Sequence, residues 1–572
     1  MKYVKMKKRL PSKYGWFFLP AAIVMANLVA TQFHFRLDLT QEKRYSLSSP
    51  TKNLLRTLPG KVSITIFLEG EMPAGLKKLS KSAKELLEEF KEYGKSNLQF
   101  ELKKPAEGLD DSSKKQFIDS LYKLGLKPTN VKATAKEGAE EQRMVFPGAL
   151  LSFRDRVSGV DFLEGQSFTD GINSINNAEA LLEFKFANAI QKITADSVPV
   201  VGYLTGNGEP FTYNVYDLIE RTIRPNYGFS FVNIDSFPLI PQNFHSIVIV
   251  KPTRPFSEKQ KLKIDQYIMY GGKVIWLIDN LYAEMDSLMR RQSDFVAFDR
   301  GLNLEDQLFK YGVRINLDLL QDLQCDKIPL VIGNLGNRPQ MELKPFPYFP
   351  LLSSYSDHPI AKNLDNVLSI FPNSIDTVKS PGIKKTILLA SSENSRILNT
   401  PAVVSFNSIK TAEDLNTFNK GHVPVAVLLE GKFTSIFTNR LSRSMADTLS
   451  NLYGQPFLPV SETDNKMIVI ANADLVTNVV TKDKGPLTMG FNQFTEYQYA
   501  NKDFFLNCME YLVNPSGVLE TRSKDFTLRL LDPKKIEAER SFWQFVNIVL
   551  PILVIILAGF IYQLIRKKKF QR

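Results

Sequence analysis

The chain has 572 residues, of which 11% are aromatic and 23% charged, a composition that excludes wholesale disorder. This length exceeds what one hydrophobic core usually serves, so we expect two or three domains. The formal net charge of +12 could indicate nucleic-acid binding, but residues 1–14 carry six Lys and Arg, residues 566–572 carry five, and neither segment contains an acid. The rest of the chain is close to neutral, which argues against a nucleic-acid-binding face.

Two uncharged apolar segments border these basic ends. Residues 15–33 are long enough, as a helix, to cross a hydrocarbon core of about 30 Å. A cleaved signal peptide is the alternative, but Leu28 stands where the cleavage site requires a small residue. Residues 542–565 carry no charge, begin beside Trp543 and end at a basic stop, which is typical of a membrane-spanning helix. We therefore predict two transmembrane helices.

The positive flanks of the two segments predict the topology. Lys and Arg next to a span favour the cytoplasmic side, so the basic tails 1–14 and 566–572 are expected in the cytoplasm. Residues 34–541 then lie across the membrane, which in a bacterium means an inner-membrane protein with a periplasmic body. Cys325 and Cys508 could form a disulfide there, but two cysteines give no disulfide framework.

Residues 34–195 predict one α/β domain. Ser48 or Ser49 can cap a short helix that contains Pro50 in its first turn. The elements expected after it are strand 61–70, helix 76–94, strand 98–105, helix 113–125, hairpin 148–165 and helix 177–194. This order of strands and helices is typical of a thioredoxin-like domain. The region contains no cysteine, so the sequence favours a scaffold or binding module over an oxidoreductase.

Residues 196–515 predict a second α/β domain, a doubly wound parallel sheet of flavodoxin-like type. Its first part is expected to contain strands 198–204, 229–235, 245–252 and 273–279 and helices 214–224 and 257–272. The pattern after residue 280 is weaker and predicts helix 304–313, a loop over 334–350, strands 385–392, 423–437 and 466–472, and helix 503–513. Residues 516–541 form a charged juxtamembrane segment that could approach the membrane as a helix.

The candidate ligand-binding residues follow predicted parallel strands. Ligands of doubly wound sheets bind at the carboxyl ends of the strands. The residues at these positions are Gly206, Asn207, Gly208 and Glu209 after strand 198–204, Asp279 after strand 273–279 and Asp474 after strand 466–472. We expect these residues to line a ligand crevice.

Both groups of residues have a structural alternative. The two glycines resemble the start of a dinucleotide-binding motif, but Phe211 stands in place of its third glycine. The sequence therefore favours a tight strand-to-helix turn over a dinucleotide site. For Asp279 and Asp474, capping of a helix N-terminus is the commoner role.

No pattern in the sequence predicts a catalytic, cofactor or metal site. The chain lacks a nucleophile-elbow motif, a zinc-binding HExxH motif and a Walker A motif, so we expect it not to hydrolyse ATP itself. Its four histidines form no metal-binding pair. Cys325 lacks the small neighbours of an activated nucleophile, and Cys508 falls in an apparent amphipathic helix, where packing is the expected role.

Several segments resemble a known family. The most specific are "RYSLSSPT" and "RPFSEKQKLKIDQYIMYGGK", and "VSITIFLEG", "YLTGNGEP" and "MIVIANADLV" also match. The chain resembles the gliding-motility-associated ABC transporter auxiliary family, GldG. The resemblance implies a second domain similar to class I glutamine amidotransferases, and it implies an ABC ATPase and a multispanning permease as partners.

The resemblance also limits which roles can be transferred to this chain. The amidotransferase cysteine and histidine are not matched, so it implies a non-catalytic domain that binds a ligand or a protein. The family often has a histidine where Asn207 stands, so no metal or acid–base role is transferred to that position.

The sequence thus predicts a non-catalytic accessory subunit of an ABC-type transporter associated with gliding motility. Its body, outside the cytoplasm, would bind substrate or partner proteins. One alternative is a structural tether of cell-envelope machinery. A less favoured alternative is a periplasmic hydrolase of amidotransferase type, which would require an activated Cys or Ser.

Overall fold

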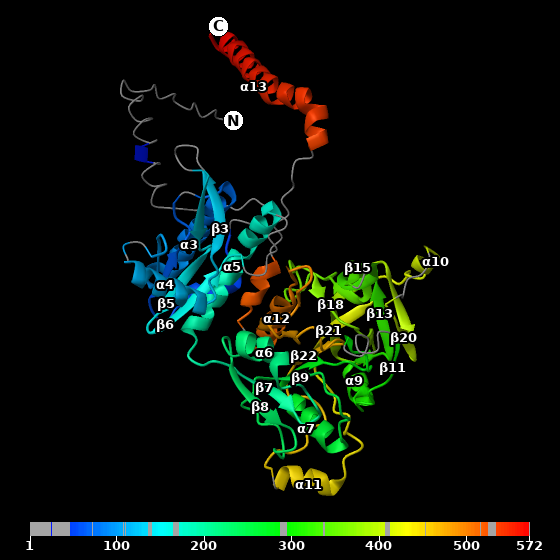
Figure 1. Ribbon diagram of the computed structural model, residues 1–572. Coiled ribbons are helices and arrows are strands. Elements are labelled where there is room, and N and C mark those ends of the chain that lie inside the picture. The colour runs from blue at the N-terminus through cyan, green and yellow to red at the C-terminus, as the bar shows by residue number, and fades with distance from the viewer. Residues whose placement is uncertain are drawn as a thin grey trace, which may run out of the picture. The chain divides into compact units, whose positions relative to one another are not determined.

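The computed structural model (Figure 1) divides the chain into two compact units, residues 1–524 and residues 525–572. It describes residues 24–25, 46–70, 72–106, 108, 110–134, 140–163, 171–285, 294–335, 338–406, 412–451, 453–514, 516–523 and 533–570. The predicted tail 1–14 and, apart from Val24 and Met25, the predicted span 15–33 lie outside these residues. The predicted domain boundaries at residues 34, 196 and 516 stay predictions.

A four-stranded sheet forms the core of the N-terminal part of the first unit. The strand order is β2-β1-β5-β6, and β1 pairs parallel with β2 and antiparallel with β5. The strands are β1 (Val62–Ile66), β2 (Leu98–Leu102), β5 (Gly148–Phe153) and β6 (Arg156–Asp161). Val62, Ile64 and Ile66 alternate with polar residues and are fully buried, which is why this segment forms a strand with one face on the core.

Helices of this part pack on the sheet and on each other. They are α2 (Ser49–Arg56), α3 (Ala74–Gly94), α4 (Asp111–Lys123) and α5 (Gly171–Thr194), with a short 3₁₀ turn η1 (Lys95–Asn97) after α3. Ser48, rather than Ser49, caps α2, because its hydroxyl accepts a hydrogen bond from Thr51 N. Ser48 N also donates to Glu183 Oε1 over 2.8 Å, which ties the start of α2 to α5.

One hairpin was not expected from the sequence. β3 (Thr129–Thr134) pairs antiparallel with β4 (Glu140–Val145) and forms a separate two-stranded sheet between α4 and β5. The two strands are largely polar in sequence and carry no apolar face of period two, which is the signal on which strand prediction depends. The other predicted strands and helices of this part are confirmed, and the thioredoxin-like fold stays a prediction.

A seven-stranded sheet forms the core of the rest of the first unit, in the order β18-β21-β22-β10-β9-β7-β8. The parallel strands are β7 (Val200–Thr205), β8 (Gly228–Asn233), β9 (Ser246–Val250), β10 (Lys273–Leu277) and β22 (Asn465–Ile470). β18 (Ile383–Ala390) and β21 (Pro424–Gly431) extend the sheet antiparallel. The strand order reverses between β7 and β9, which is the position where doubly wound sheets form a ligand crevice.

Local sequence signals explain where α7 (Glu258–Met269) begins and ends. Ser257 and Gln260 form a reciprocal capping box at its start. Gly271, at a φ of 90°, ends it as predicted. The predicted helix 214–224 is wrong as one regular helix, since it consists of η3 (Tyr213–Val215), α6 (Tyr216–Leu218) and the π-helical turn η4 (Ile219–Ile223). The Thr222 hydroxyl bonds the carbonyl of Asp217, five residues back, at this wider turn.

The loop predicted over residues 334–350 is wrong. In the described residues β15 (Arg338–Leu352) pairs antiparallel with β14 (Cys325–Leu335) as a long hairpin. On its other edge β15 pairs only at Leu351 and Leu352, with β16 (Val367–Leu368). Its prolines are therefore tolerated, because a strand with a free edge does not require every N–H to donate.

The remaining elements are short and surround the larger sheet. The strand pairs are β11 (Phe295–Ala297) with β20 (Ala402–Val404), β12 (Val313–Ile315) with β17 (Ile375–Thr377), β13 (Asp318–Asp322) with β19 (Ser395–Asn399), β23 (Val480–Thr481) with β24 (Gly485–Pro486), and β25 (Phe491–Asn492) with β26 (Tyr497–Gln498). The helices are α9 (Glu305–Tyr311), α10 (Ala412–Leu415), α11 (Arg443–Asn451), α12 (Asn501–Val513) and the 3₁₀ turn η5 (Val518–Ser523). The predicted strand 423–437 is shorter than expected, since β21 ends at Gly431.

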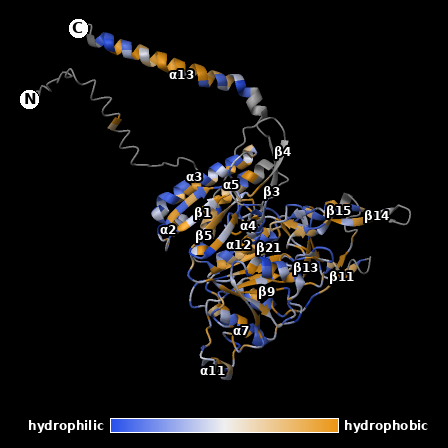
Figure 2. Ribbon diagram, turned by 60° about the vertical axis from the view of Figure 1, so that its left-hand side comes forward, coloured by the Kyte–Doolittle hydropathy of each residue, from blue (hydrophilic) through white to orange (hydrophobic). Residues whose placement is uncertain are grey.

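The second unit contains one long helix, α13 (Pro533–Phe570). Its segment 539–568 is the one described helix that is long and apolar enough to cross a membrane, and none of its most apolar window is buried. Figure 2 shows hydrophobic residues along the middle of this helix. The segment includes the predicted span 542–565 and supports association with a membrane. The predicted juxtamembrane segment 516–541 is a 3₁₀ turn over η5 and α-helical from Pro533 onward.

Candidate ligand-binding site

The structure places all six predicted site residues at the carboxyl ends of parallel strands. Gly206, Asn207, Gly208 and Glu209 follow β7, Asp279 follows β10, and Asp474 follows β22. The loop that follows β9 contacts both groups. These contacts show whether the predicted ligand crevice has room for a ligand.

The turn after β7 is closed onto the β9 loop. The carbonyl of Asn207 accepts from Thr253 N and Arg254 N, both over 2.9 Å. The Asn207 side chain donates to the carbonyl of Pro255 and to Gln260 Oε1. Asn207 is only 2% exposed. This geometry agrees with the tight turn that the sequence favours, because the Asn207 side chain hydrogen-bonds to neighbouring loops and is not exposed to a ligand.

Glu209 also hydrogen-bonds within the turn. One of its carboxylate oxygens accepts from Asn207 N over 2.8 Å. The side chain is nearly fully buried, and burial raises the pKa of this carboxyl despite its hydrogen bonds to backbone N–H groups. One oxygen of this carboxylate is thus used by the turn, and the other, Oε1, is buried without a hydrogen-bond partner among the described residues.

Replacing Gly208 with alanine is expected to lower the free energy of unfolding by about 2 kcal/mol. Gly208 has a φ of 83°, which costs other residues about 1–2 kcal/mol, and a Cβ there would lie 2.1 Å from Thr253 Oγ1. Gly271→Ala is the matched control, because Gly271 also has a positive φ but no atom within 4 Å of an added Cβ. Urea unfolding measures both variants, and an equal loss in the two would contradict a close approach at Gly208.

The two predicted aspartates meet at a lysine that the sequence analysis missed. Lys251 Nζ lies 2.7 Å and 2.8 Å from the two oxygens of Asp474 and 3.6 Å from Asp279 Oδ2. Lys251 directly follows the fully buried strand β9, and its φ is 47°, which is uncommon outside glycine. A charged residue directly after the apolar run 247–250 is the signal that could have identified it.

The ion-pair network extends beyond these three residues. Lys251 Nζ lies 3.2 Å from Glu284, which also pairs with Arg300 over 2.6 Å. Burial alone would lower the pKa of Lys251, but Asp474, Asp279 and Glu284 together raise it. The carboxylates are thus bound to the chain's own cations, so this part of the crevice is filled by the protein.

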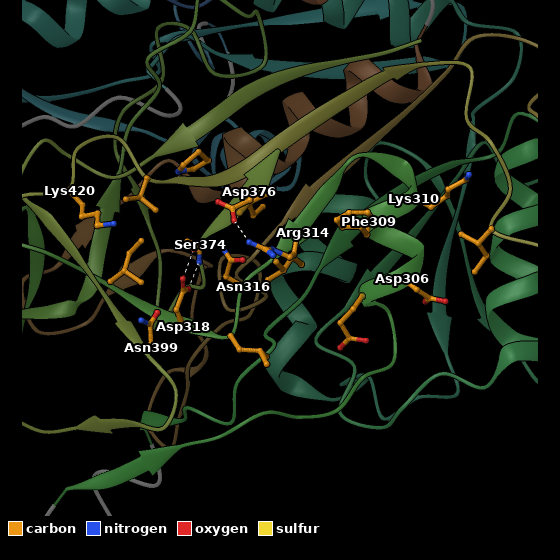
Figure 3. Close-up of a pocket in the computed structure, with 18 of the residues that line it drawn as sticks. Asp306, Phe309, Lys310, Arg314, Asn316, Asp318, Ser374, Asp376, Asn399 and Lys420 are labelled. Carbon is orange, nitrogen blue, oxygen red and sulfur yellow. Dashed lines mark hydrogen bonds and ion pairs between the residues drawn. The ribbon is translucent and has the colours of Figure 1, made fainter. Parts of the chain in front are cut away.

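A separate open groove (Figure 3) has a volume of about 1310 Å³. It is lined by α9, the β12–β17 pair, the end of β19 and the loops 420–424 and 435–440. Arg314 and Asp376 are opposite each other in the β12–β17 register and form an ion pair of 2.6 Å. Ser374 binds Asp318 through its hydroxyl and its backbone N–H.

The groove combines charged, polar and aromatic groups. Phe309 is 52% exposed, and in the described part of the chain neither Lys310 nor Lys420 has an ion-pair partner. Burial raises the pKa of Asp318 although Ser374 donates to it. Such a surface suits an elongated polar ligand or a protein segment. The groove could not be predicted from the sequence, because five separate segments build it and none carries a recognisable motif.

The cysteine thiols offer no nucleophile. Cys325 and Cys508 are both free thiols, so the disulfide that the sequence left open is not formed. Burial, together with the nearby Asp322 and Asp326, raises the pKa of Cys325 to about 12. Burial raises the pKa of Cys508 as well, and Cys508 packs in the core as predicted. Both thiols therefore stay protonated near neutral pH.

Comparison with known families identifies the chain at the level of its family. Residues 198–508 match the family described as "ABC-type uncharacterized transport system", and this match covers more than half of the chain. The chain belongs to this family. It is therefore an auxiliary component of an ABC-type transport system. The matched region contains all six predicted site residues and the groove. Residues 41–152 match a domain of unknown function, DUF7088.

Comparisons with individual proteins add little to this assignment. No curated protein matches the chain. A solved structure described as "mmIFT52 N-terminal domain" is similar at 11% sequence identity, covering 55% of this chain and 97% of its own, with a TM-score of 0.30. A likeness at this level carries no conclusion about fold or function.

Proposed function

We propose that the chain is a non-catalytic accessory subunit of an ABC-type transporter associated with gliding motility. The family match over residues 198–508 is the observation that carries this proposal. An ABC ATPase and a multispanning permease would be its partners. The groove of Figure 3 would bind the transported substrate or a partner protein.

The proposal includes a location and a topology. The fully exposed apolar helix α13 and the predicted span 15–33 would anchor the chain in the inner membrane. Both basic ends would lie in the cytoplasm and the body in the periplasm, as the positive flanks favour. The body would consist of a thioredoxin-like and a flavodoxin-like domain, and the observed strand orders β2-β1-β5-β6 and β8-β7-β9-β10-β22 support these two assignments.

Two observations support a non-catalytic role. The family is one of auxiliary proteins, and the two thiols stay protonated near neutral pH. A hydrolase of amidotransferase type would require an activated cysteine or serine. In the groove Ser374 donates its hydroxyl proton to Asp318, whose pKa is raised by burial, and no histidine bonds to Ser374 in the described residues.

Affinity purification of the full chain in mild detergent tests the proposal. We expect an ATPase and a permease to be recovered together with the chain. The replacement of both Phe309 and Arg314 by alanine is expected to lower their recovery if the groove binds a partner protein. Phe298→Ala, at an exposed aromatic outside the groove, is the matched control. Recovery of envelope proteins alone would instead support a structural tether.

A further inference from the structure

The 3₁₀ turn η5 is a buried segment, although it immediately precedes the residues that connect to α13. Val518 is 1% exposed, Leu519 4% and Thr521 1%. η5 packs against α5, α2 and α12. A segment that the sequence presents as charged and peripheral is thus enclosed by helices of the first unit.

Arg522 of η5 is a charged residue that lies within this enclosed region. The residue is only 6% exposed, and its Nε is buried without a hydrogen-bond partner. Its guanidinium lies 5.0 Å from the ring of Phe184, and in the part of the chain that the structure describes its Nε donates to no acceptor. The Arg522 carbonyl accepts from Asn363. A guanidinium has five N–H donors, and leaving such donors unsatisfied in a protein interior is costly.

The charge of Arg522 is only partly compensated. Burial lowers the pKa of Arg522 to about 10, and the nearby Asp503 opposes this shift. The guanidinium therefore stays charged at neutral pH. A buried charge that its neighbours compensate only in part is unfavourable, so an anion that binds the guanidinium is expected to stabilise the folded protein.

A cavity of about 770 Å³ gives access to Arg522. It is lined by residues of α5, α12 and β6 and by the segment 363–365. Asn188 Oδ1 belongs to a residue that lines the same cavity and is buried without a hydrogen-bond donor. Asp217 also lines the cavity, and its Oδ1 lies 3.6 Å from Arg221 Nη1. Lys192 lines it as well and lies 3.7 Å from Glu510. The cavity thus offers the guanidinium of Arg522, whose Nε has no acceptor, and one acceptor oxygen, Asn188 Oδ1, that has no donor.

We propose that this cavity binds a small oxyanion, a carboxylate or phosphate group, through the guanidinium of Arg522. The planar fork of arginine matches two oxygens of such a group and forms two parallel hydrogen bonds. A ligand that also carries a hydroxyl or ammonium group could donate to Asn188 Oδ1. The groove of Figure 3 has a different character, because its arginines Arg314 and Arg440 are exposed and paired with aspartates.

This inference goes beyond the proposed function, and it stands whether or not a permease is recovered with the chain. The detergent-solubilised full chain is titrated with inorganic phosphate and, separately, with acetate, at constant ionic strength set by chloride. Isothermal titration and the thermal unfolding midpoint measure binding. We expect saturable binding of at least one of the two anions with a rise of the midpoint, and their relative affinities separate phosphate from carboxylate recognition.

Variants of the arginine assign the binding to the cavity. Arg522→Gln is expected to weaken binding by at least about tenfold, and Arg522→Lys by less, because lysine keeps the charge but loses the fork. Arg314→Gln, which removes an exposed arginine in the groove, is the matched control and is expected to bind as the wild type does.

Three results would overturn the proposal. They are the absence of saturable binding to the wild type, equal affinity in Arg522→Gln, and an equal loss in Arg314→Gln. If Arg522→Gln does not fold, Arg522→Lys replaces it. This variant keeps the positive charge but loses the fork and is expected to weaken binding severalfold, and unchanged affinity in it would overturn the proposal.

Discussion

The substitution Lys251→Met is expected to lower the free energy of unfolding by about 3–5 kcal/mol. The lysine ammonium lies within 3.6 Å of Asp474, Asp279 and Glu284, and its side chain is only 13% exposed. Methionine has a similar length and keeps the packing of the aliphatic part. The substitution therefore removes the cation and leaves three carboxylates close together in a largely dry site, where their mutual repulsion is weakly screened.

Urea unfolding of the detergent-solubilised chain measures this loss. The reporter is the fluorescence of Trp276, which is fully buried in β10, the strand that Asp279 follows. Lys310→Met is the matched control, because it removes an exposed lysine of the groove, and we expect its effect to stay within about 0.5 kcal/mol. A similar loss in both variants would show that the Lys251 network contributes nothing specific.

A double variant separates the charge effect from packing. Adding Asp474→Asn to Lys251→Met removes one of the stranded carboxylates, so we expect the double variant to be more stable than the sum of the single effects by about 1–3 kcal/mol. Strict additivity would mean that Lys251 and Asp474 do not stabilise each other.

Much of the parallel sheet could be predicted from the sequence because its signals are local. After their first residues, Ser246 and Lys273, β9 and β10 are short continuous apolar runs, as strands buried on both faces require. The capping residue Ser257 and the terminal glycine Gly271 mark the ends of α7. Each of these signals acts through neighbours in the chain, and each was read correctly.

The elements that were missed depend on distant contacts. The prolines of β15 are compatible with a strand only because one edge of that strand is largely free. The polar hairpin β3–β4 has no apolar periodicity, so its pairing cannot be read from composition. In both cases tertiary context overrides a local preference.

The candidate sites show the same limit. The sequence placed Asp279 and Asp474 correctly at strand ends, because the carboxyl ends of parallel strands share one edge. It did not show that Lys251 fills the space between them, since that depends on the positive φ of one residue. Nor did it show that Arg522 is buried, because a charged segment beside a membrane span is normally exposed.

Asp279 is expected to make the stability of the protein fall as the pH rises from about 4 to about 6. Burial raises the pKa of this carboxyl to about 6, with Lys251 opposing and Asp474 assisting the shift. The unfolded chain has an aspartate pKa of about 4, so the folded state binds more protons between these two values, and its stability decreases with pH there. Two pKa units correspond to about 3 kcal/mol.

The comparison of wild type with Asp279→Asn isolates this contribution, because asparagine keeps an oxygen for the hydrogen bond from Ala473 N but does not titrate. We expect the stability of the wild type relative to this variant to fall by about 3 kcal/mol between pH 4 and pH 7 and to level off above pH 7.

Asp306→Asn is the control, for which we expect a pH dependence of opposite sign. Burial alone would raise the pKa of Asp306, but hydrogen bonds from Lys261 and Arg440 lower it. The wild type should therefore gain stability relative to Asp306→Asn as the pH rises through the acidic range. If both differences had the same slope, burial would not raise the pKa of Asp279 above its value in the unfolded chain.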